Sequence, residues 1–147
     1  MRDFDHGKVY SDTYIQDILG SVRTIAMVRA SANPAKPSHI VMQFLIEAGY
    51  DVILINPRRG LTQICGLKVY HSLKYVDRSV DMVDVFRPSH ELVEIARQAL
   101  EIKAKVLWSQ LGIQDDEAAR IAGDGGLKVV MDRCPMIELA SDTMKNH

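Results

Sequence analysis

Short apolar runs alternate with longer amphipathic stretches along most of the chain. The runs are rich in β-branched residues and mostly continuously apolar, which predicts strands that are covered on both faces. They span Thr24–Val28, Val52–Ile55, Met82–Phe86, Val106–Trp108 and Leu127–Met131. Each gap leaves room for one crossover, and crossovers of this kind join parallel strands. The pattern therefore predicts an α/β fold, a doubly wound domain with a five-stranded parallel sheet.

The intervening stretches carry apolar residues at the spacing of helix faces. Gly49 follows the first face and is typical of the position just after a helix, and Ser89 is a plausible N-cap of the second. A third helix is expected to begin near Asp115, and an extra N-terminal helix precedes the first strand. The segment Pro57–Gly66 is expected to be loop, with a short helix around Leu73–Val76. The apolar positions of the four main helices are Val41, Phe44, Leu45 and Ala48; Leu92, Ile95, Ala96 and Ala99; Ala118, Ala119, Ile121 and Ala122; and Ile15, Ile18, Leu19 and Val22.

Composition narrows the function classes. The chain has 147 residues, of which 47% are hydrophobic and 25% charged, a profile that predicts one soluble globular domain over residues 1–147. A net charge of −1 gives no general attraction to polyanions, so no nucleic-acid partner is expected. The longest stretch without a formal charge, Pro37–Ile46, is about half of the ~20 residues that a membrane span needs. Met1–His6 has no apolar core of a signal peptide. We therefore expect a cytoplasmic protein without a membrane partner.

The two cysteines, Cys65 and Cys134, lie far apart and form no metal-binding or disulfide-dense spacing. None of the five histidines stands at ligand spacing from another histidine, a cysteine or an acid, so no metal site is expected. Cys134 follows Asp132 and Arg133 directly after the last strand, but no histidine lies close in sequence to serve as its base. We assign no catalytic residue.

The residues that follow each strand are the candidates for ligand binding, because ligands of doubly wound sheets bind beyond the carboxyl ends of the strands. After the first strand, a loop from Arg29 to Ser38 leads into a helix N-terminus and offers an anion site. The alternative is a proline-stiffened turn in which Ser38 caps the helix. The loop holds no glycine, so it is not a glycine fingerprint.

The second strand ends in Asn56-Pro57-Arg58-Arg59. Arginines at this position suit a phosphorylated ribose, since guanidinium groups grip phosphate, and this favours NADP or coenzyme A (CoA) over NAD. A solvated basic turn is the alternative.

Later strands add Phe86-Arg87, an aromatic ring and a guanidinium that would sandwich a purine, and Ser109–Gly112, which would line a channel. Asp84 lies inside an apolar run and is expected to bond a backbone N–H or an arginine.

Five ordered blocks resemble the small stand-alone CoA-binding proteins, which are similar to the N-terminal CoA-binding domain of the succinyl-CoA synthetase α subunit. The resemblance runs from about Thr24 to Glu138 and implies a Rossmann-like fold with strand order 3-2-1-4-5. The blocks are Ser31–Ser38, Asn56–Arg58, Val83–Arg87, Leu107–Gly112 and Val129–Cys134.

The resemblance also implies a role for each block in binding CoA or an acyl-CoA. The pyrophosphate would be cradled by Ser31, Asn33, Lys36, Pro37 and Ser38, the adenosine and its 3′-phosphate by Asn56 and Arg58, the adenine by Phe86 and Arg87, and the pantetheine arm by Gln110 and Leu111. Such proteins usually lack the ATP-grasp domain and the phosphohistidine segment of the synthetase. A binding function is therefore expected rather than a complete enzyme.

One residue departs from the family pattern. Arg29 stands where the family has glycine, a residue that permits positive φ and a close approach to phosphate. Arg29 either obstructs that approach or supplies an extra cation. Two other functions stay open. One is an enzyme, either an NADP-dependent reductase or other nucleotide-dependent enzyme, or a CoA transferase fragment that uses Cys134 or Asp132; the other is a regulatory module with a degenerate pocket. A homodimer is a further expectation.

Overall fold

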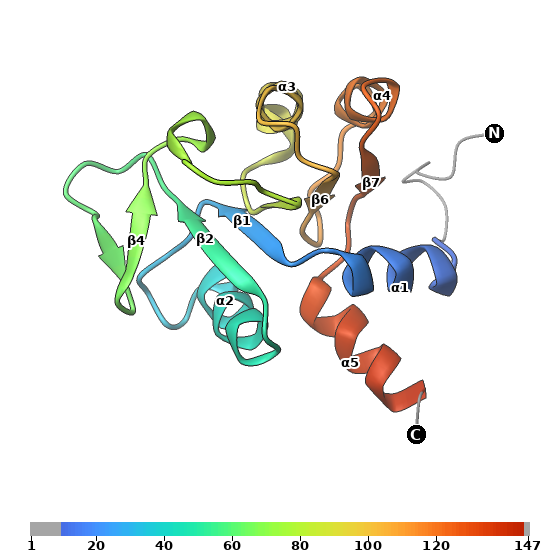
Figure 1. The fold of residues 1–147 in the computed structure, drawn as a ribbon, viewed down its shortest axis with the longest axis horizontal. Helices are drawn as coiled ribbons and strands as arrows, with labels where there is room; N and C mark the ends of the chain where they lie inside the picture. Colours follow the sequence, from blue (N-terminus) through green and yellow to red (C-terminus); the bar gives the residue numbers. More distant parts are fainter. Residues whose placement is uncertain (1–9, 146–147) are drawn as a thin grey trace.

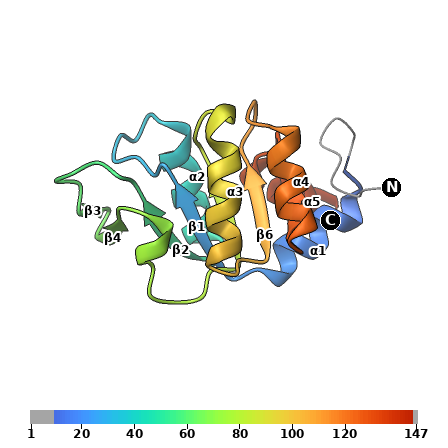
Figure 2. The same cartoon turned by 90° about the horizontal axis from the view of Figure 1, so that it is seen from above.

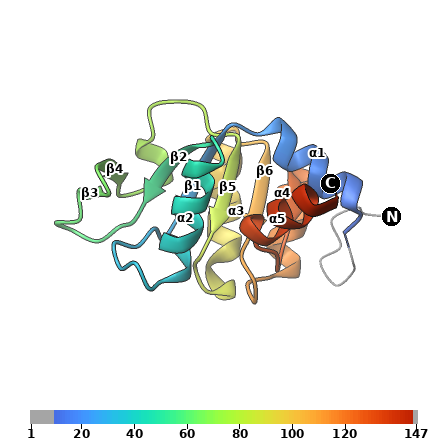
Figure 3. The same ribbon diagram turned by 90° about the horizontal axis from the view of Figure 1, so that it is seen from below.

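A single sheet lies between two layers of helices in the computed structural model of the protein (Figure 1). The structure describes residues 10–145. One face of the sheet is covered by α1 (Asp12–Ser21), α2 (Pro37–Glu47) and α5 (Pro135–Lys145), which lie in front in Figure 3. The other face is covered by α3 (Leu92–Glu101) and α4 (Asp116–Asp124), which lie in front in Figure 2. The architecture is the Rossmann-like α/β fold predicted from the sequence.

The sheet holds seven strands in the order β3-β4-β2-β1-β5-β6-β7 within residues 10–145. Every neighbouring pair is parallel except β3 with β4. The strands are β1 (Thr24–Val28), β2 (Asp51–Ile55), β3 (Gln63–Ile64), β4 (Leu67–Tyr70), β5 (Met82–Val85), β6 (Val106–Ser109) and β7 (Lys128–Val130).

The predicted five strands and their order 3-2-1-4-5 are therefore wrong. All five apolar runs are strands, but the third run, β5, pairs with β1 on the side away from β2. The position beside β2 is taken by β4, which pairs with it through Leu54–Val69 and Ile55–Tyr70. The segment Pro57–Gly66 is not all loop either, because Gln63–Ile64 pairs with β4 as a hairpin. Both added strands are too short and too exposed to read as buried apolar runs.

The helices agree with the predicted faces except at Ala48, which is exposed just after the end of α2, and they differ at two starts. Pro37 occupies the first turn of α2 and Lys36 is its N-cap, so Ser38 does not cap the helix; the fixed φ of proline suits that first position. Ser89 belongs to a 3₁₀ turn ahead of α3, and its Oγ accepts the Gln114 N–H instead of capping. α4 begins beside Asp115 as expected, and the Asp115 side chain caps it by accepting the Ala118 N–H.

Other predicted elements are present. Gly49 follows α2 with φ +98°, the left-handed conformation expected after a helix. The short helix near Leu73 is a 3₁₀ turn over Leu73–Tyr75. The segment Met1–His6 lies outside the described residues. None of the helices within residues 10–145 is long and apolar enough to cross a membrane.

Side chains of each strand alternate between two apolar cores. Met27, Leu54 and Trp108 pack toward α1, α2 and α5, whereas Ala26, Ile53 and Leu107 pack toward α3 and α4. Asp84 stands in register between Met27 and Trp108, so its side chain enters the first of these cores. The carboxyl ends of β1, β2, β5 and β6 lie at the same edge of the sheet because these strands are parallel. The loops that follow the four strands meet at this edge.

Candidate binding pocket

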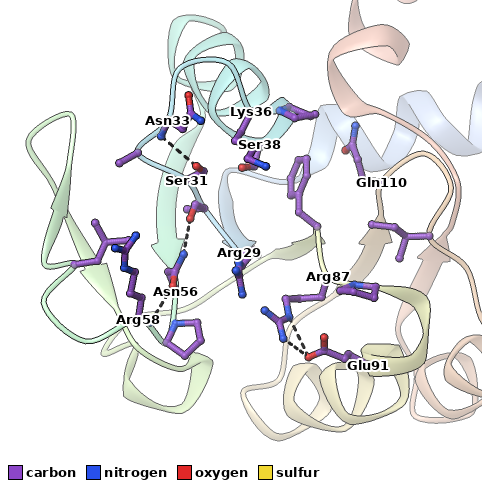
Figure 4. A pocket seen from close by; sticks show the side chains of 18 of the residues that line it. Arg29, Ser31, Asn33, Lys36, Ser38, Asn56, Arg58, Arg87, Glu91 and Gln110 are labelled. Carbon is purple, nitrogen blue, oxygen red and sulfur yellow. Dashed lines mark hydrogen bonds and ion pairs between the residues drawn. The ribbon is translucent and has the colours of Figure 1, made fainter.

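A pocket of about 1070 Å³ lies at this edge of the sheet (Figure 4). Its volume is at the upper end of the range for small-molecule sites, which suits a large ligand. All the candidate binding residues from the sequence line it: Arg29, Ser31, Asn33, Lys36, Pro37, Ser38, Asn56, Arg58, Phe86, Arg87, Gln110 and Leu111. The lining also includes residues that were not predicted: Ala30, Ala32, Pro57, Leu61, Pro88, Glu91 and Ile113.

The backbone at Arg29 adopts the conformation that glycine favours. Its φ is +81°, and its N–H and that of Ala30 both donate to the Ile55 carbonyl oxygen, at 2.9 and 3.0 Å. The Asn56 side chain ties the same loop to β2, since its Nδ2 donates to the Ala30 carbonyl oxygen at 2.8 Å. Its Oδ1 accepts the Arg58 N–H at 2.9 Å. Asn56 therefore fixes both loops of this side of the pocket.

The β1–α2 loop leaves the start of α2 without a side-chain cap. Ser31 Oγ accepts the Asn33 N–H at 3.1 Å, and Asn33 Oδ1 accepts the Ala35 N–H at 3.0 Å, so both side chains shape the turn itself. Pro37 starts the helix and Ser38 follows it at the pocket surface. Pro37 has no N–H, and the N–H groups of His39 and Ile40 donate to the Lys36 carbonyl oxygen. The Ser38 N–H and the positive end of the helix dipole are therefore what this turn offers to an anion.

Three cations come from the β1 and β2 side of the pocket. Arg29, Lys36 and Arg58 are exposed, and none forms an ion pair with any other residue of the described range. We call these three residues the cationic wall. Because the chain as a whole carries a charge of only −1, this charge is local to the pocket. The wall is suited to phosphate groups.

The β5 and β6 side of the pocket is balanced in charge. Arg87 donates to Glu91 Oε1 through Nε at 3.0 Å and through a terminal nitrogen at 2.5 Å. Phe86, Leu111 and Ile113 supply apolar surface beside this pair. We call these five residues the paired wall. It suits an uncharged part of a ligand rather than a second anion.

Two buried polar side chains, those of Asp84 and Gln110, have atoms without a hydrogen-bond partner among the described residues. Asp84 is fully buried, and neither of its carboxyl oxygens bonds to a described residue, so the expected N–H or arginine partner is wrong. Burial in the apolar core raises the pKa of Asp84 to about 8, because desolvation penalises the charged form. The Oε1 of Gln110, at the pocket floor, is likewise buried and without a partner in the described range.

Several polar residues suggested by the sequence stand elsewhere. Arg59 does not line the pocket, although its neighbour Arg58 does. Ser109 is buried and donates to the Ile113 carbonyl oxygen at 2.6 Å. Asp132 Oδ1 accepts the Gly112 N–H at 2.7 Å, and Cys134 is 3% exposed within the core of the sheet. The last two residues therefore hold the fold together and do not face the pocket.

No three histidines, cysteines or acids gather as metal ligands in the described part of the chain. One thiol and one imidazole do lie close together, however: Cys65 Sγ is 3.9 Å from His39 Nε2. The sequence did not indicate this contact, because Cys65 and His39 are 26 residues apart and only the folding of the β3–β4 hairpin brings them together.

Comparison with known proteins places the chain beside proteins of similar size and fold. Residues 23–140 match the family described as CoA binding domain, which confirms the resemblance found in the five blocks. An uncharacterised protein of Bacillus subtilis, YneT, is 37% identical over 84% of this chain and 90% of its own length. A hypothetical protein from Pyrococcus horikoshii has a solved structure with a TM-score of 0.86 and 33% identity, covering 96% of each chain.

A more distant relative is an enzyme subunit. The α subunit of the ADP-forming acetate–CoA ligase I of Pyrococcus furiosus is 28% identical over 95 residues. The match covers 62% of this chain and 21% of that subunit. The chain therefore corresponds to one part of that much longer protein.

Proposed function

This protein belongs to the CoA-binding domain family, and we propose that its pocket binds CoA or an acyl-CoA without catalysing a reaction on it. The observation that carries the proposal is the cationic wall, which has no ion-pair partner among residues 10–145 and stands beside the start of α2, where no side chain caps the helix. Three free cations and a helix N-terminus suit a ligand with several phosphates. CoA carries a pyrophosphate and a separate 3′-phosphate, which gives each part of the wall a partner.

The two walls suggest how the ligand would lie. Lys36 and the first turn of α2 would meet the pyrophosphate, and Arg58 would meet the 3′-phosphate near Asn56. The adenine would lie beside Phe86 and Arg87. The uncharged pantetheine arm would follow Gln110 and Leu111, where the pocket is apolar.

Arg29 supports retained binding rather than a degenerate pocket. Its backbone already has the positive φ that the family's glycine would supply, and the pocket keeps a volume of about 1070 Å³ with the arginine side chain in its lining. We propose that the guanidinium of Arg29 serves as an extra cation for the phosphates. A regulatory module that has lost its ligand would have no use for three unpaired charges at one edge.

An enzyme based on Cys134 or Asp132 finds little support. Cys134 is buried in the core, Asp132 is held by the Gly112 N–H, and neither lines the pocket. Glu91 has the one carboxylate among the described residues that line the pocket, and it is paired with Arg87. We therefore propose a binding or carrier role.

Calorimetric titration of the protein with CoA, NADP and NAD tests the proposal. We expect CoA to bind most tightly, since only CoA has a pantetheine arm to occupy the paired wall. Tighter binding of NADP than of CoA would favour the reductase alternative, and the absence of binding by all three would favour the degenerate pocket. Native mass spectrometry of the purified protein adds an independent readout, with a bound mass equal to CoA or an acyl-CoA as the expected result.

A further inference from the structure

A cysteine and a histidine face each other between the β3–β4 hairpin and α2, outside the pocket. Cys65 Sγ lies 3.9 Å from His39 Nε2, and Gln43 Nε2 donates to the same sulfur at 3.4 Å. Cys65 is exposed, whereas His39 is only 7% exposed. None of the three residues lines the pocket. The cluster is therefore a separate feature of the molecule, with its sulfur open to solvent and its imidazole held beneath.

The backbone fixes which nitrogen of His39 carries the proton. Nδ1 lies 2.7 Å from the Ser31 carbonyl oxygen, which can only accept a hydrogen bond. Nδ1 must therefore be the donor, and in the neutral ring Nε2 then keeps its lone pair. Nε2 lies 3.9 Å from Cys65 Sγ and 3.5 Å from Gln43 Nε2, so the Gln43 amide can donate to the base as well as to the sulfur. This arrangement, in which a third group orients the base beside the nucleophile, is typical of activated cysteines.

The hairpin turn positions the thiol. Cys65 and Gly66 have φ of +50° and +81° and join Ile64 to Leu67, which are paired across the turn. A two-residue hairpin of this kind needs positive φ at both positions, and asparagine or glycine normally fills them. A cysteine here holds its side chain at the tip of the hairpin, above the face of α2 that carries His39 and Gln43.

We propose that Cys65 is a base-activated thiol that exchanges with small-molecule disulfides, with His39 as its proton acceptor. The Cys65 sulfur gives up its proton to His39 Nε2 and attacks one sulfur of the disulfide R–S–S–R. The S–S bond of that molecule breaks as the bond from Cys65 to one R–S group forms, and the electron pair leaves with the other R–S⁻. His39 returns the proton to this thiolate, so atoms and charge balance. Gln43 stabilises the sulfur by its N–H donation.

The step does not depend on the proposed CoA function, because Cys65, His39 and Gln43 all lie outside the pocket lining, although the Ser31 carbonyl oxygen that orients His39 belongs to a lining residue. The test uses hydroxyethyl disulfide, an uncharged reagent, on the whole protein, with intact-mass and peptide mass spectrometry as readouts. We expect one mixed disulfide, located at Cys65 and absent in Cys65→Ser. Cys134, which is 3% exposed, should stay unmodified.

His39→Asn is the main variant, since an asparagine amide can still donate to the Ser31 carbonyl oxygen but offers no base. We expect it to slow the exchange at neutral pH on the order of tenfold or more. The gap should narrow in alkaline solution, because hydroxide ion can then take the proton in place of His39. A merely structural role for His39 would not give this pH dependence. His90→Asn, which changes an exposed histidine on the far side of the pocket, should react as the wild type does.

Equal rates for the wild type and His39→Asn at neutral pH would overturn the proposal, as would modification at Cys134. If thermal melting shows that His39→Asn does not fold, His39→Gln replaces it. That variant also offers no base and should slow the exchange to a similar extent, and an unchanged rate would then count against the proposal.

Discussion

The two walls of the pocket carry similar residue types but balance their charges differently. In the cationic wall, Arg29, Lys36 and Arg58 stand on loops that offer no carboxylate. In the paired wall, Arg87 is held by Glu91 at 2.5 Å, one helical turn away. A guanidinium that already has a carboxylate partner is a weaker attractant for phosphate, because binding must compete with the existing ion pair. The difference indicates that a ligand places its anionic part against the first wall and its uncharged part against the second.

The largest expected effect is on the free energy of unfolding, and it arises on β5, the strand that leads into the paired wall. Asp84 lies on β5, and burial raises its pKa to about 8 from an ordinary value of 3.8. Because the folded state holds this proton more tightly than the unfolded state, its contribution to stability is present at low pH and is lost as the pH rises from about 4 through about 8. The loss should approach about 1.4 kcal/mol per pH unit within this window.

Asp84→Asn removes this titration. Chemical denaturation should show that the free energy of unfolding of the variant, relative to that of the wild type, increases steadily from pH 5 to pH 8. Asp81→Asn is the matched comparison, because the pKa of Asp81 is shifted in the opposite direction. Burial acts to raise the pKa of Asp81, but the N–H groups of Arg23 and Thr24 and the charge of Lys105 outweigh it and lower the pKa. The cost of Asp81→Asn should therefore be greatest near neutral pH and shrink in acid. If the difference in unfolding free energy between Asp84→Asn and the wild type did not change with pH, the claim that Asp84 is a buried, neutral carboxyl would be wrong.

The next effect concerns the cationic wall. Arg58→Ala should weaken CoA binding by about 1.5–3 kcal/mol, the range for a charge-assisted hydrogen bond. Arg59→Ala is the matched control, since it removes the same charge from the adjacent position outside the pocket. Calorimetry of both variants checks the prediction. Equal losses for the two would mean that only the general charge of the loop matters.

A smaller effect, of opposite sign, is expected from the paired wall. Glu91→Gln releases Arg87 from its ion pair and adds an unpaired cation to the pocket. Because both side chains are partly exposed, the pair is weak, and the affinity for CoA should rise by roughly 0.5–1 kcal/mol. The increase should vanish in high salt, which screens exposed charges. A loss of affinity would show that Glu91 itself contacts the ligand.

The smallest effect is expected at the apolar part of the paired wall. Leu111 is 53% exposed and would lose part of that exposure to a pantetheine arm. Leu111→Ala should weaken CoA binding by about 0.5–1 kcal/mol, on the scale of one buried methylene. A CoA fragment that lacks the pantetheine arm serves as the control ligand, and its affinity should not change. A similar loss for the fragment would place Leu111 against the nucleotide instead.

The sequence predicted the pocket better than the sheet. Arg29, Asn56, Phe86 and Gln110 follow four different strands, and the carboxyl ends of parallel strands share one edge whatever their order. Their convergence in one pocket therefore needed only the number of buried runs and their direction. Glu91 was missed because it lies four residues beyond Arg87, where the 3₁₀ turn ahead of α3 brings it back to the pocket.

The strand order could not be predicted in the same way. β4 has an exposed Lys68 and a half-buried Tyr70, so its pattern is that of an edge strand and not of an apolar run. Its pairing with β2 depends on a tertiary contact and leaves β5 to pair with β1. The Cys65–His39 contact has the same origin, since it exists only when the hairpin folds back over α2.

The most direct test compares the affinities of the wild-type protein for CoA and for 3′-dephospho-CoA by calorimetry. The two ligands differ in a single phosphate, the one assigned to Arg58. If the cationic wall captures this group, CoA binds at least about tenfold more tightly, equivalent to about 1.4 kcal/mol. Equal affinities for the two ligands would contradict the assignment, and the absence of binding by either would contradict the function itself.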